Sequence, residues 1–369
     1  MGRFLFFSLA KHQSLYFQHL LDENRLNGRV VTPHQLPMPS LRGLRRIFSS
    51  IDWARLIDEK CRERVVKKKY NGFFYRLLLR LEIFLVALRV QALVNKERPD
   101  VAVVWNGANR YCQVLLCLLP QETRTFFVEN GLLPNTTTID ARGVNYHNSV
   151  PRDAAFYRAY AEGKDIEVES NVALIPRKPR VTGQEAVSLP EHFIFIPFQD
   201  DRDTQVRLFS PWVRGMRDLF ALGERVARET GICVVFKEHP SSRESYADLH
   251  ERTHDHLRFA NGNPTQELIE KSLFVVTLNS TVGLESLLLG KPLLTLGQAF
   301  FNIEGVVMHA DSSDEAIEAV RCFPDWPLDE PLRLSFLHFL RHEYCVPGRW
   351  QDASPEHLRE AARRMRGVV

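Results

Sequence analysis

Paired cysteines and clustered metal ligands are both missing from this chain of 369 residues. Its six cysteines form neither a C-x-x-C pair nor the Cys/His spacing of a zinc site, and no H-E-x-x-H motif occurs. These absences argue against a disulfide framework and against a zinc ion, and they favour a reduced, cytoplasmic protein. We expect the chemistry to need no metal ion and no cofactor.

Secretion signals and uncharged apolar runs of membrane-spanning length are missing too. The first residues, MGRFLFFSLAKHQ, lack the apolar core and cleavage site of a signal peptide, so they are predicted to form a first buried strand. Residues 73–94 are rich in leucine but contain Arg76, Arg80, Glu82 and Arg89, whose charges are costly inside a bilayer. This segment is predicted to be a core helix with polar margins.

Glycine-rich nucleotide motifs are absent as well. No strand candidate is followed by G-x-G-x-x-G, and G-x-x-x-x-G-K-[ST] does not occur, which weakens nicotinamide-binding and P-loop interpretations. Nucleic acid is not expected as a partner, because the chain has no recognition motif and no aromatic residues interleaved with its basic stretch.

The chain alternates short apolar runs with segments of helical period, which is typical of βα units and parallel sheets. Strands are expected at residues 3–9, 29–31, 101–105 and 125–128, and again at 193–197, 232–236, 273–278 and 293–296. Residues 172–192, with three prolines and a glycine, form the candidate linker. We therefore predict an α/β protein with two Rossmann-like domains, at residues 1–180 and 190–345, followed by a C-terminal helix within residues 346–369.

Polar residues follow two neighbouring strand candidates of the second half. Lys237 and His239 come directly after one apolar run, and the sequence Asn279-Ser280-Thr281 follows the next and opens a helix. A helix start with small hydroxyls can bind a phosphate, and a cation with a proton donor can neutralise one that departs. An isolated Ser-Thr pair more often only caps its helix. Glu285, one turn further on, is a candidate for binding ribose or a solvent-facing residue.

Carboxylates follow one strand candidate in each half. Glu129 ends the run FFVE, and FQDDRDTQ places Gln199, Asp200, Asp201 and Asp203 after the first strand of the second half. Two carboxylates in different surroundings can divide nucleophile and acid/base roles. For Asp200 and Asp201 the capping of a turn is the stronger interpretation.

These segments together resemble one bacterial family. VENGLLPNTTTIDARGVNYHNSVPR, PFQDDRDTQ, KEHP and NSTVGLESLLLGKPLLTLGQAFF are similar, in this order, to the capsule polysaccharide biosynthesis proteins of the KpsC, KpsS and WbbB type. The similarity covers about residues 105–305. It implies the GT-B glycosyltransferase architecture with an active-site cleft between domains. It also implies transfer of 3-deoxy-D-manno-oct-2-ulosonic acid (Kdo) from CMP-β-Kdo, with retention, to a glycan or glycolipid acceptor.

The resemblance further implies roles for individual residues. Asp203 would be the nucleophile or ion-pair stabiliser at the anomeric carbon, and Glu129 the acid/base that deprotonates the acceptor hydroxyl. Lys237 and His239 would assist the departure of CMP. The donor would be held by these two and by Gln199, Asn279, Ser280, Thr281 and Glu285, and the acceptor, on a weaker similarity, by Asn106 and Gly107. KpsC-type proteins carry two such catalytic units and this chain only one, so it should form one linkage.

Partners and alternatives remain open at this stage. Between Arg42 and Arg89 the chain has thirteen lysines or arginines against five acidic residues, although its net charge is only +3. This basic region is a candidate for peripheral contact with anionic lipid at the inner face of the inner membrane, or with a capsule-assembly complex. Ordinary helix surface charge explains such a run about as often. The alternatives in function are a polymerase that transfers a phosphopolyol from a CDP-linked donor and a non-catalytic polysaccharide-binding or export-assembly module.

Overall fold

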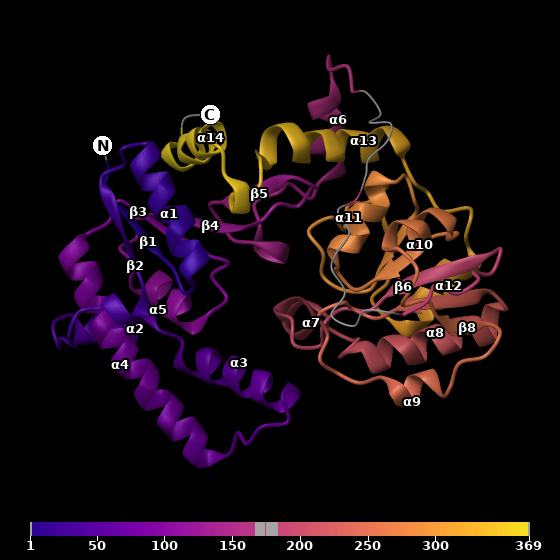
Figure 1. Ribbon diagram of the computed structural model, residues 1–369, viewed down its shortest axis with the longest axis horizontal. Coiled ribbons are helices and arrows are strands. Elements are labelled where there is room, and N and C mark those ends of the chain that lie inside the picture. Colours follow the sequence, from indigo (N-terminus) through magenta and orange to yellow (C-terminus); the bar gives the residue numbers. More distant parts are fainter. Residues whose placement is uncertain (1, 167–173, 175–183, 368–369) are drawn as a thin grey trace. The chain divides into compact units, whose positions relative to one another are not determined.

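The computed structural model describes residues 2–166, 174 and 184–367 (Figure 1). Two compact units divide the chain. Unit 1 contains Met1–Ser149 and Tyr344–Val369, and unit 2 contains Val150–Glu343. Each has its own six-stranded sheet and its own apolar interior, so the prediction of an α/β protein with two Rossmann-like domains is confirmed.

The sheet of unit 1 has the strand order β12-β5-β4-β3-β1-β2, with parallel pairing from β4 to β2 and antiparallel pairing at β4-β5 and β5-β12. Its central strands β1 and β3 are buried along their whole length, which explains their unbroken apolar sequences FLFF and VAVVW. The strands are β1 (Phe4–Phe7), β2 (Gly28–Val31), β3 (Val101–Trp105), β4 (Arg124–Asn130), β5 (Thr136–Asp140) and β12 (Val346–Pro347).

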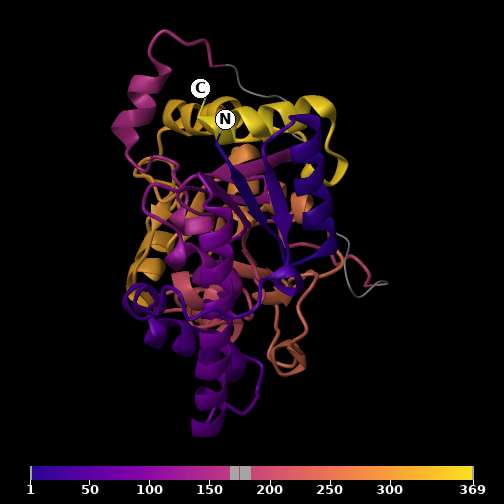
Figure 2. The same cartoon turned by 90° about the vertical axis from the view of Figure 1, so that its left-hand side faces the viewer.

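Helices cover both faces of this sheet. One face packs against α1 (Lys11–Glu23) and α14 (Pro355–Arg366), which lie beside each other in both views (Figures 1 and 2). The other face packs against a second group of helices, namely α2 (Leu44–Ser50), α3 (Trp53–Val66), α4 (Phe73–Glu97) and α5 (Arg110–Leu118). The sheet edge β12 and helix α14 come from the end of the chain, so the C-terminal segment completes unit 1.

The sheet of unit 2 has the order β11-β10-β9-β6-β7-β8, and its pairs are parallel. Its strands are β6 (Phe193–Pro197), β7 (Cys233–Lys237), β8 (Leu257–Phe259), β9 (Val275–Thr277), β10 (Leu293–Thr295) and β11 (Met308–His309). Its helices are α6 (Ala154–Ala161), α7 (Thr204–Phe209), α8 (Met216–Thr230), α9 (Ala247–His250), α10 (Thr265–Lys271), α11 (Thr281–Leu288), α12 (Ser313–Arg321) and α13 (Glu330–Phe339).

The boundaries of the units differ from those predicted. Residues 150–166 group with unit 2, because α6 packs on α13 and Ser335 Oγ donates a hydrogen bond to the carbonyl of Tyr157 at 2.6 Å. The predicted C-terminal helix is confirmed as α14, with Ser354 as its N-cap, but it belongs to unit 1. Most of the predicted linker, residues 172–173 and 175–183, lies outside the described residues.

The strand orders show where each sheet would bind a ligand. In unit 2 the chain runs outward from β6 to β7 and β8, then returns to the other side of β6 with β9. In unit 1 the corresponding reversal lies between β1 and β3. Ligands of open α/β sheets bind beyond the carboxyl ends of the strands at such reversals. No helix in the described part of the chain is long and apolar enough to cross a membrane.

Candidate active site

Three loops of unit 2 lie at the carboxyl ends of the strands of its sheet, because β9, β6 and β7 are neighbouring parallel strands. The loop after β6 contains Asp203, the loop after β7 contains His239, and Ser280 follows β9. The structure therefore brings the predicted donor-side residues to the carboxyl edge at the reversal of the sheet. Their roles in binding and chemistry stay predictions.

Asp203 is the N-cap of α7. Its Oδ1 accepts hydrogen bonds from the backbone N–H of Gln205 at 2.9 Å and from Thr204 Oγ1 at 3.3 Å. The side chain is exposed, and Oδ2 accepts no hydrogen bond from any residue that the structure describes. The helix start thus holds Oδ1 and orients the carboxylate, while Oδ2 keeps its lone pairs available for another contact.

The two neighbouring aspartates turn out to be structural, as their sequence context indicated. Asp201 is largely buried, and its two oxygens accept hydrogen bonds from Met216 N at 2.8 Å and Tyr246 Oη at 3.0 Å. Burial raises the pKa of Asp201, partly offset by these hydrogen bonds. Asp200 Oδ1 accepts from Arg202 N at 2.9 Å and so shapes the turn that precedes Asp203.

Gln199 and Asn279 connect the loop after β6 to the loop after β9. Gln199 Nε2 donates to Asn279 Oδ1 at 3.1 Å, and Asn279 Nδ2 donates to the carbonyls of Gln205 and Phe209, both at 3.1 Å. Only 6% of Gln199 and 2% of Asn279 is exposed. Their described hydrogen bonds join α7 to the start of α11, and the contact of both residues with the donor stays a prediction.

Lys237 is held by backbone carbonyls. Its Nζ donates to Asn261 O and Asn263 O, each at 2.6 Å, and burial lowers its pKa. These bonds fix the end of β7 to the loop after β8. The predicted contact of this ammonium with the departing nucleotide stays a prediction.

His239 has a defined proton arrangement in its neutral form. Its Nδ1 lies 3.3 Å from the backbone N–H of Ser241 and 2.9 Å from Ser241 Oγ. Because a backbone N–H can only donate, Nδ1 accepts, and Nε2 carries the ring proton. In this tautomer the ring donates through Nε2–H, and the predicted role of His239 at a phosphate stays a prediction.

Ser280 caps α11. Its Oγ accepts a hydrogen bond from Val282 N at 3.2 Å, and the residue is 8% exposed. Thr281 is the exposed first residue of the helix, and Glu285 is half-buried one turn later. The capping role that sequence analysis kept open is therefore real. Val282 N and Gly283 N have acceptors in Ser280 Oγ and Ser280 O, so the binding of a phosphate at this helix start stays a prediction.

In unit 1, Glu129 and Asn106 lie together at the ends of the neighbouring strands β4 and β3. Asn106 Nδ2 donates to Glu129 Oε2 at 2.6 Å, and Asn130 N donates to Oε1 at 2.9 Å. Asn106 and Gly107 have left-handed backbone angles, with φ of 59° and 83°. A Cβ at Gly107 would stand 2.6 Å from the ring of Phe127, so the turn requires glycine.

Sequence analysis missed an aromatic cluster beside this carboxylate. The rings of Trp105 and Trp350 are 4.7 Å apart, and His12 lies 5.3 Å from Trp350. Trp350 Nε1 donates to the side chain of Asn130 at 2.8 Å. Trp350 comes from the far end of the chain, so only the fold of unit 1 reveals this proximity.

Asp140 was missed as well, although it organises the loop that follows β5. Its two oxygens accept hydrogen bonds from the backbone N–H of Arg142 and Gly143, from Ser149 N and Oγ, and from Tyr344 Oη. The residue is 2% exposed. The signal in the sequence was Asp-Ala-Arg-Gly, a turn in which an aspartate side chain bonds the backbone that follows.

No group of three or more His, Cys, Asp or Glu side chains in the described part of the chain is placed to hold a metal ion. The polar groups at the two sheet edges are carboxylates, an imidazole, hydroxyls and backbone N–H groups. The chemistry that these groups offer is nucleophilic attack, proton transfer and the binding of an anion.

Comparison with known proteins relates the chain to capsule polysaccharide biosynthesis. The sequence profile described as "Capsule polysaccharide biosynthesis protein" matches residues 177–325, which include the three donor-side loops. The capsule polysaccharide export protein KpsS of Escherichia coli is 23% identical, over 49% of this chain and 62% of KpsS. This chain belongs to the capsule polysaccharide biosynthesis family. Protein FixF of Sinorhizobium fredii is 36% identical to this family member, over 68% of the chain and 61% of FixF.

The match spans about three fifths of the length of FixF and of KpsS. A solved structure extends the comparison to nearly all of the chain. The "beta Kdo 2,7 transferase" of Thermosulfurimonas dismutans KpsC superposes with a TM-score of 0.51 at 15% identity, covering 98% of each chain. At this identity the likeness concerns the fold, and it confirms the predicted fold class.

Proposed function

We propose that this family member is a glycosyltransferase that transfers Kdo from CMP-β-Kdo to a glycan or glycolipid acceptor in bacterial surface polysaccharide synthesis. The observation that carries the proposal is the meeting of Asp203, His239 and the start of α11 at one sheet edge, on neighbouring strands. The family assignment supports the pathway, and the fold of a β-Kdo transferase supports the reaction type. A cytoplasmic location belongs to the proposal, and a glycolipid acceptor would bring the protein to the inner face of the inner membrane.

In the first step the Asp203 carboxylate attacks the anomeric carbon of Kdo. The bond from that carbon to the phosphate oxygen breaks, and its electron pair leaves with CMP. Ser280 and Thr281 at the start of α11 hold the phosphate, the Nε2–H of His239 donates to it as its charge grows, and Glu285 binds ribose. Lys237 contributes its positive charge nearby while its bonds to two carbonyls hold the loop.

In the second step the acceptor hydroxyl attacks the same carbon and releases Asp203. Glu129 takes the hydroxyl proton, and Asn106 holds the carboxylate through its bond to Oε2. Because each displacement inverts the anomeric centre, two of them retain the β configuration. This ketosidic centre has no neighbouring acetamido or hydroxyl group to assist, so retention needs either a protein nucleophile or front-face attack, and two carboxylates permit the first.

The test is to incubate the purified protein with CMP-Kdo and measure CMP, free Kdo and transferred Kdo. The proposal predicts CMP release, with slow formation of free Kdo when no acceptor is present. Turnover of a CDP-linked polyol instead, with CMP-Kdo left intact, would establish the phosphopolyol polymerase. A protein that binds polysaccharide and turns over neither donor would be a binding or assembly module.

A further inference from the structure

The first half of α4 carries an exposed apolar surface that the fold does not use. Sequence analysis predicted a core helix for residues 73–94, and the second half of α4 fits that prediction. The first half does not, because six large apolar side chains on it face solvent. We call this set the apolar face of α4: Phe73 (74% exposed), Phe74 (70%), Leu77 (47%), Leu78 (65%), Leu81 (53%) and Leu85 (53%).

These six positions form one continuous stripe. At about 100° per residue they fall within roughly 140° of the helix circumference. The side chains by which α4 packs into unit 1, among them Leu79, Ile83 and Val90, lie on the opposite side and are nearly fully buried. The core therefore already has its contact with α4, and the stripe is a second, separate surface. A contiguous exposed apolar patch of this kind marks an interaction site.

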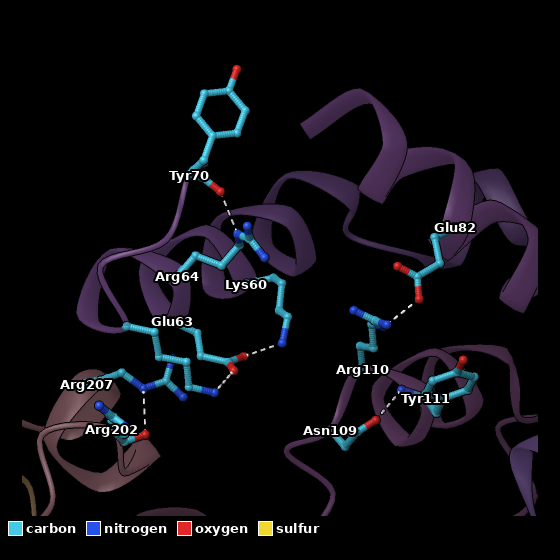
Figure 3. A network of polar contacts seen from close by, with 11 residues as sticks. Lys60, Glu63, Arg64, Tyr70, Glu82, Asn109, Arg110, Tyr111, Arg202 and Arg207 are labelled. Atoms are coloured by element: carbon cyan, nitrogen blue, oxygen red, sulfur yellow. Dashed lines mark hydrogen bonds and ion pairs between the residues drawn. The ribbon is translucent and has the colours of Figure 1, made fainter. Parts of the chain in front are cut away.

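The helix and its neighbour present this surface on a firm support. Figure 1 shows the start of α4 as the part of the helix farthest from the sheet of unit 1. Lys60 and Lys67 both bind Glu63, and Arg64 Nε donates to the carbonyl of Tyr70 at 2.6 Å, which ties α3 to the turn before α4 (Figure 3). Burial acts to raise the pKa of Glu63, but the two lysines outweigh it and lower the pKa to about 2.

The charges around the stripe are positive. Arg62, Lys68, Lys69 and Arg80 are exposed, and their side chains have no ion-pair or hydrogen-bond partner among the described residues. The acidic side chains of α3 and of the first half of α4 are all occupied in ion pairs: Asp58 with Arg76, Glu59 with Arg55, Glu63 with its two lysines, and Glu82 with Arg110. Figure 3 shows the pairs of Glu63 and Glu82. Helix α3, the turn after it and the first half of α4 therefore carry unpaired positive charges next to the apolar face of α4.

An apolar face beside unpaired basic side chains favours one kind of binding partner over another. A second copy of the chain docked through the same stripe would bring the same basic side chains together, which is unfavourable. An anionic bilayer surface accepts the apolar side chains between its headgroups and attracts the basic ones. We propose that the first half of α4 lies in the interface of an anionic membrane, with the apolar face of α4 inserted and Lys68, Lys69 and Arg80 at the phosphates.

The proposal is tested by flotation of the 369-residue protein with vesicles of phosphatidylcholine alone and of phosphatidylcholine with phosphatidylglycerol. Wild type should float with the anionic vesicles and be released as salt is raised. The variant Phe74→Ser/Leu78→Ser/Leu81→Ser should bind them roughly tenfold more weakly or worse, since its apolar insertion is lost. Lys68→Glu/Lys69→Glu/Arg80→Glu should lose the preference for anionic over neutral vesicles.

A matched control removes three exposed apolar side chains elsewhere. Leu15→Ser/Met38→Ser/Val187→Ser should float like wild type. Release of CMP from CMP-Kdo without vesicles should be equal in all these proteins, so membrane docking can fail while the proposed transferase activity stands. Equal flotation of the α4 triple variant and wild type would overturn the proposal. So would a wild-type dimer in sedimentation that the α4 triple variant dissociates, because the stripe would then bind a second copy.

Discussion

Asp203 combines a helix cap with the proposed nucleophile, and the two roles can be separated by substitution. In Asp203→Asn the side-chain amide oxygen would still accept the bond from Gln205 N, because asparagine caps helices as well as aspartate does. Asp203→Asn should therefore change the free energy of unfolding by less than about 0.5 kcal/mol, while Kdo transfer falls by about 10³-fold or more.

Denaturant unfolding and initial rates of CMP release measure the two quantities. Asp200→Asn is the matched control, since it removes a carboxylate from the same loop and should leave most of the rate. If Asp203→Asn keeps more than a tenth of the wild-type rate, the nucleophile is another group.

His357 links acid stability to the packing of α14. Its Nδ1 lies 2.7 Å from the carbonyl of Pro347 and its Nε2 2.8 Å from Tyr16 Oη, so the neutral ring donates to the carbonyl and accepts from tyrosine. Burial lowers the pKa of His357, an effect that the bond to Pro347 partly offsets. The native state thus binds this proton less readily than the unfolded chain.

We therefore expect stability to fall as pH drops below about 6.5, by at most about 1.4 kcal/mol per pH unit for this one site. The measurement is denaturant unfolding between pH 5 and 8 on wild type and His357→Gln. The variant should show a shallower loss on the acid side. Parallel curves would mean that other groups cause the acid sensitivity.

At these positions the sequence predicted at which strand ends the candidate side chains lie, but not their surroundings. Asn106 and Glu129 were each placed at a strand end, which is readable from apolar runs, but their hydrogen bond was not predicted. That Gln199 and Asn279 are buried partners could not be read, since burial depends on how two distant loops pack. The nearness of Trp350 to Glu129's neighbour Asn130 depends on a chain segment more than two hundred residues away.

Among the helices, α11 offers a test of phosphate binding that is independent of capping. Ser280→Asp keeps an oxygen to accept from Val282 N, so stability should change by less than about 0.5 kcal/mol. The added negative charge would repel a phosphate at the same helix start, so CMP affinity should fall at least tenfold.

Ser280→Ala should behave in the opposite way, losing about 1 kcal/mol of stability with a smaller loss of affinity. Calorimetric titration with CMP and unfolding curves give both values. Unchanged CMP affinity in Ser280→Asp would place the phosphate elsewhere.

The observed strands show which strands an apolar sequence pattern can predict and which it cannot. All eight predicted strands are present. Of these, β1, β3 and β6 are buried along their whole length and have unbroken apolar runs, whereas β2 and β4 are partly exposed and were found from shorter apolar stretches. The four that were not predicted are β5, β8, β11 and β12. The last three are two or three residues long, too short for a pattern, and β5 reads TTTID, whose threonines carry no apolar signal. The first half of α4 was wrongly predicted to be buried, because a leucine-rich sequence does not distinguish side chains buried in the core from exposed ones.

The core and the sheet of unit 1 include residues from the C-terminal segment 346–369. Leu358, Ala361 and Met365 of α14 are buried against the sheet, and β12 extends it. Each large apolar side chain that loses its burial costs about 1.5–3 kcal/mol. Deletion of residues 346–369 should therefore unfold unit 1 or leave it open, while unit 2, which is continuous in sequence, keeps its core.

Hydrogen exchange followed by mass spectrometry distinguishes the two units. Peptides of β1, β3 and α1 should lose protection in the deleted protein, and peptides of β6 and β7 should keep it. Arg363→Ser, on the exposed side of α14, is the control, and in this variant both units should show the hydrogen-exchange protection of wild type. Equal protection of β1 in the deleted protein would show that unit 1 is complete without the C-terminal segment.

The central claim is that this family member forms a covalent bond from Asp203 to Kdo. The direct measurement is the intact mass of the protein after brief incubation with CMP-Kdo in the absence of an acceptor, for wild type, Asp203→Ala and Glu129→Gln. The account predicts a mass increase of one Kdo on wild type, more of it on Glu129→Gln, where the acid/base is missing, and none on Asp203→Ala. CMP release by wild type with no adduct in any of the three, or an adduct that persists in Asp203→Ala, would contradict it.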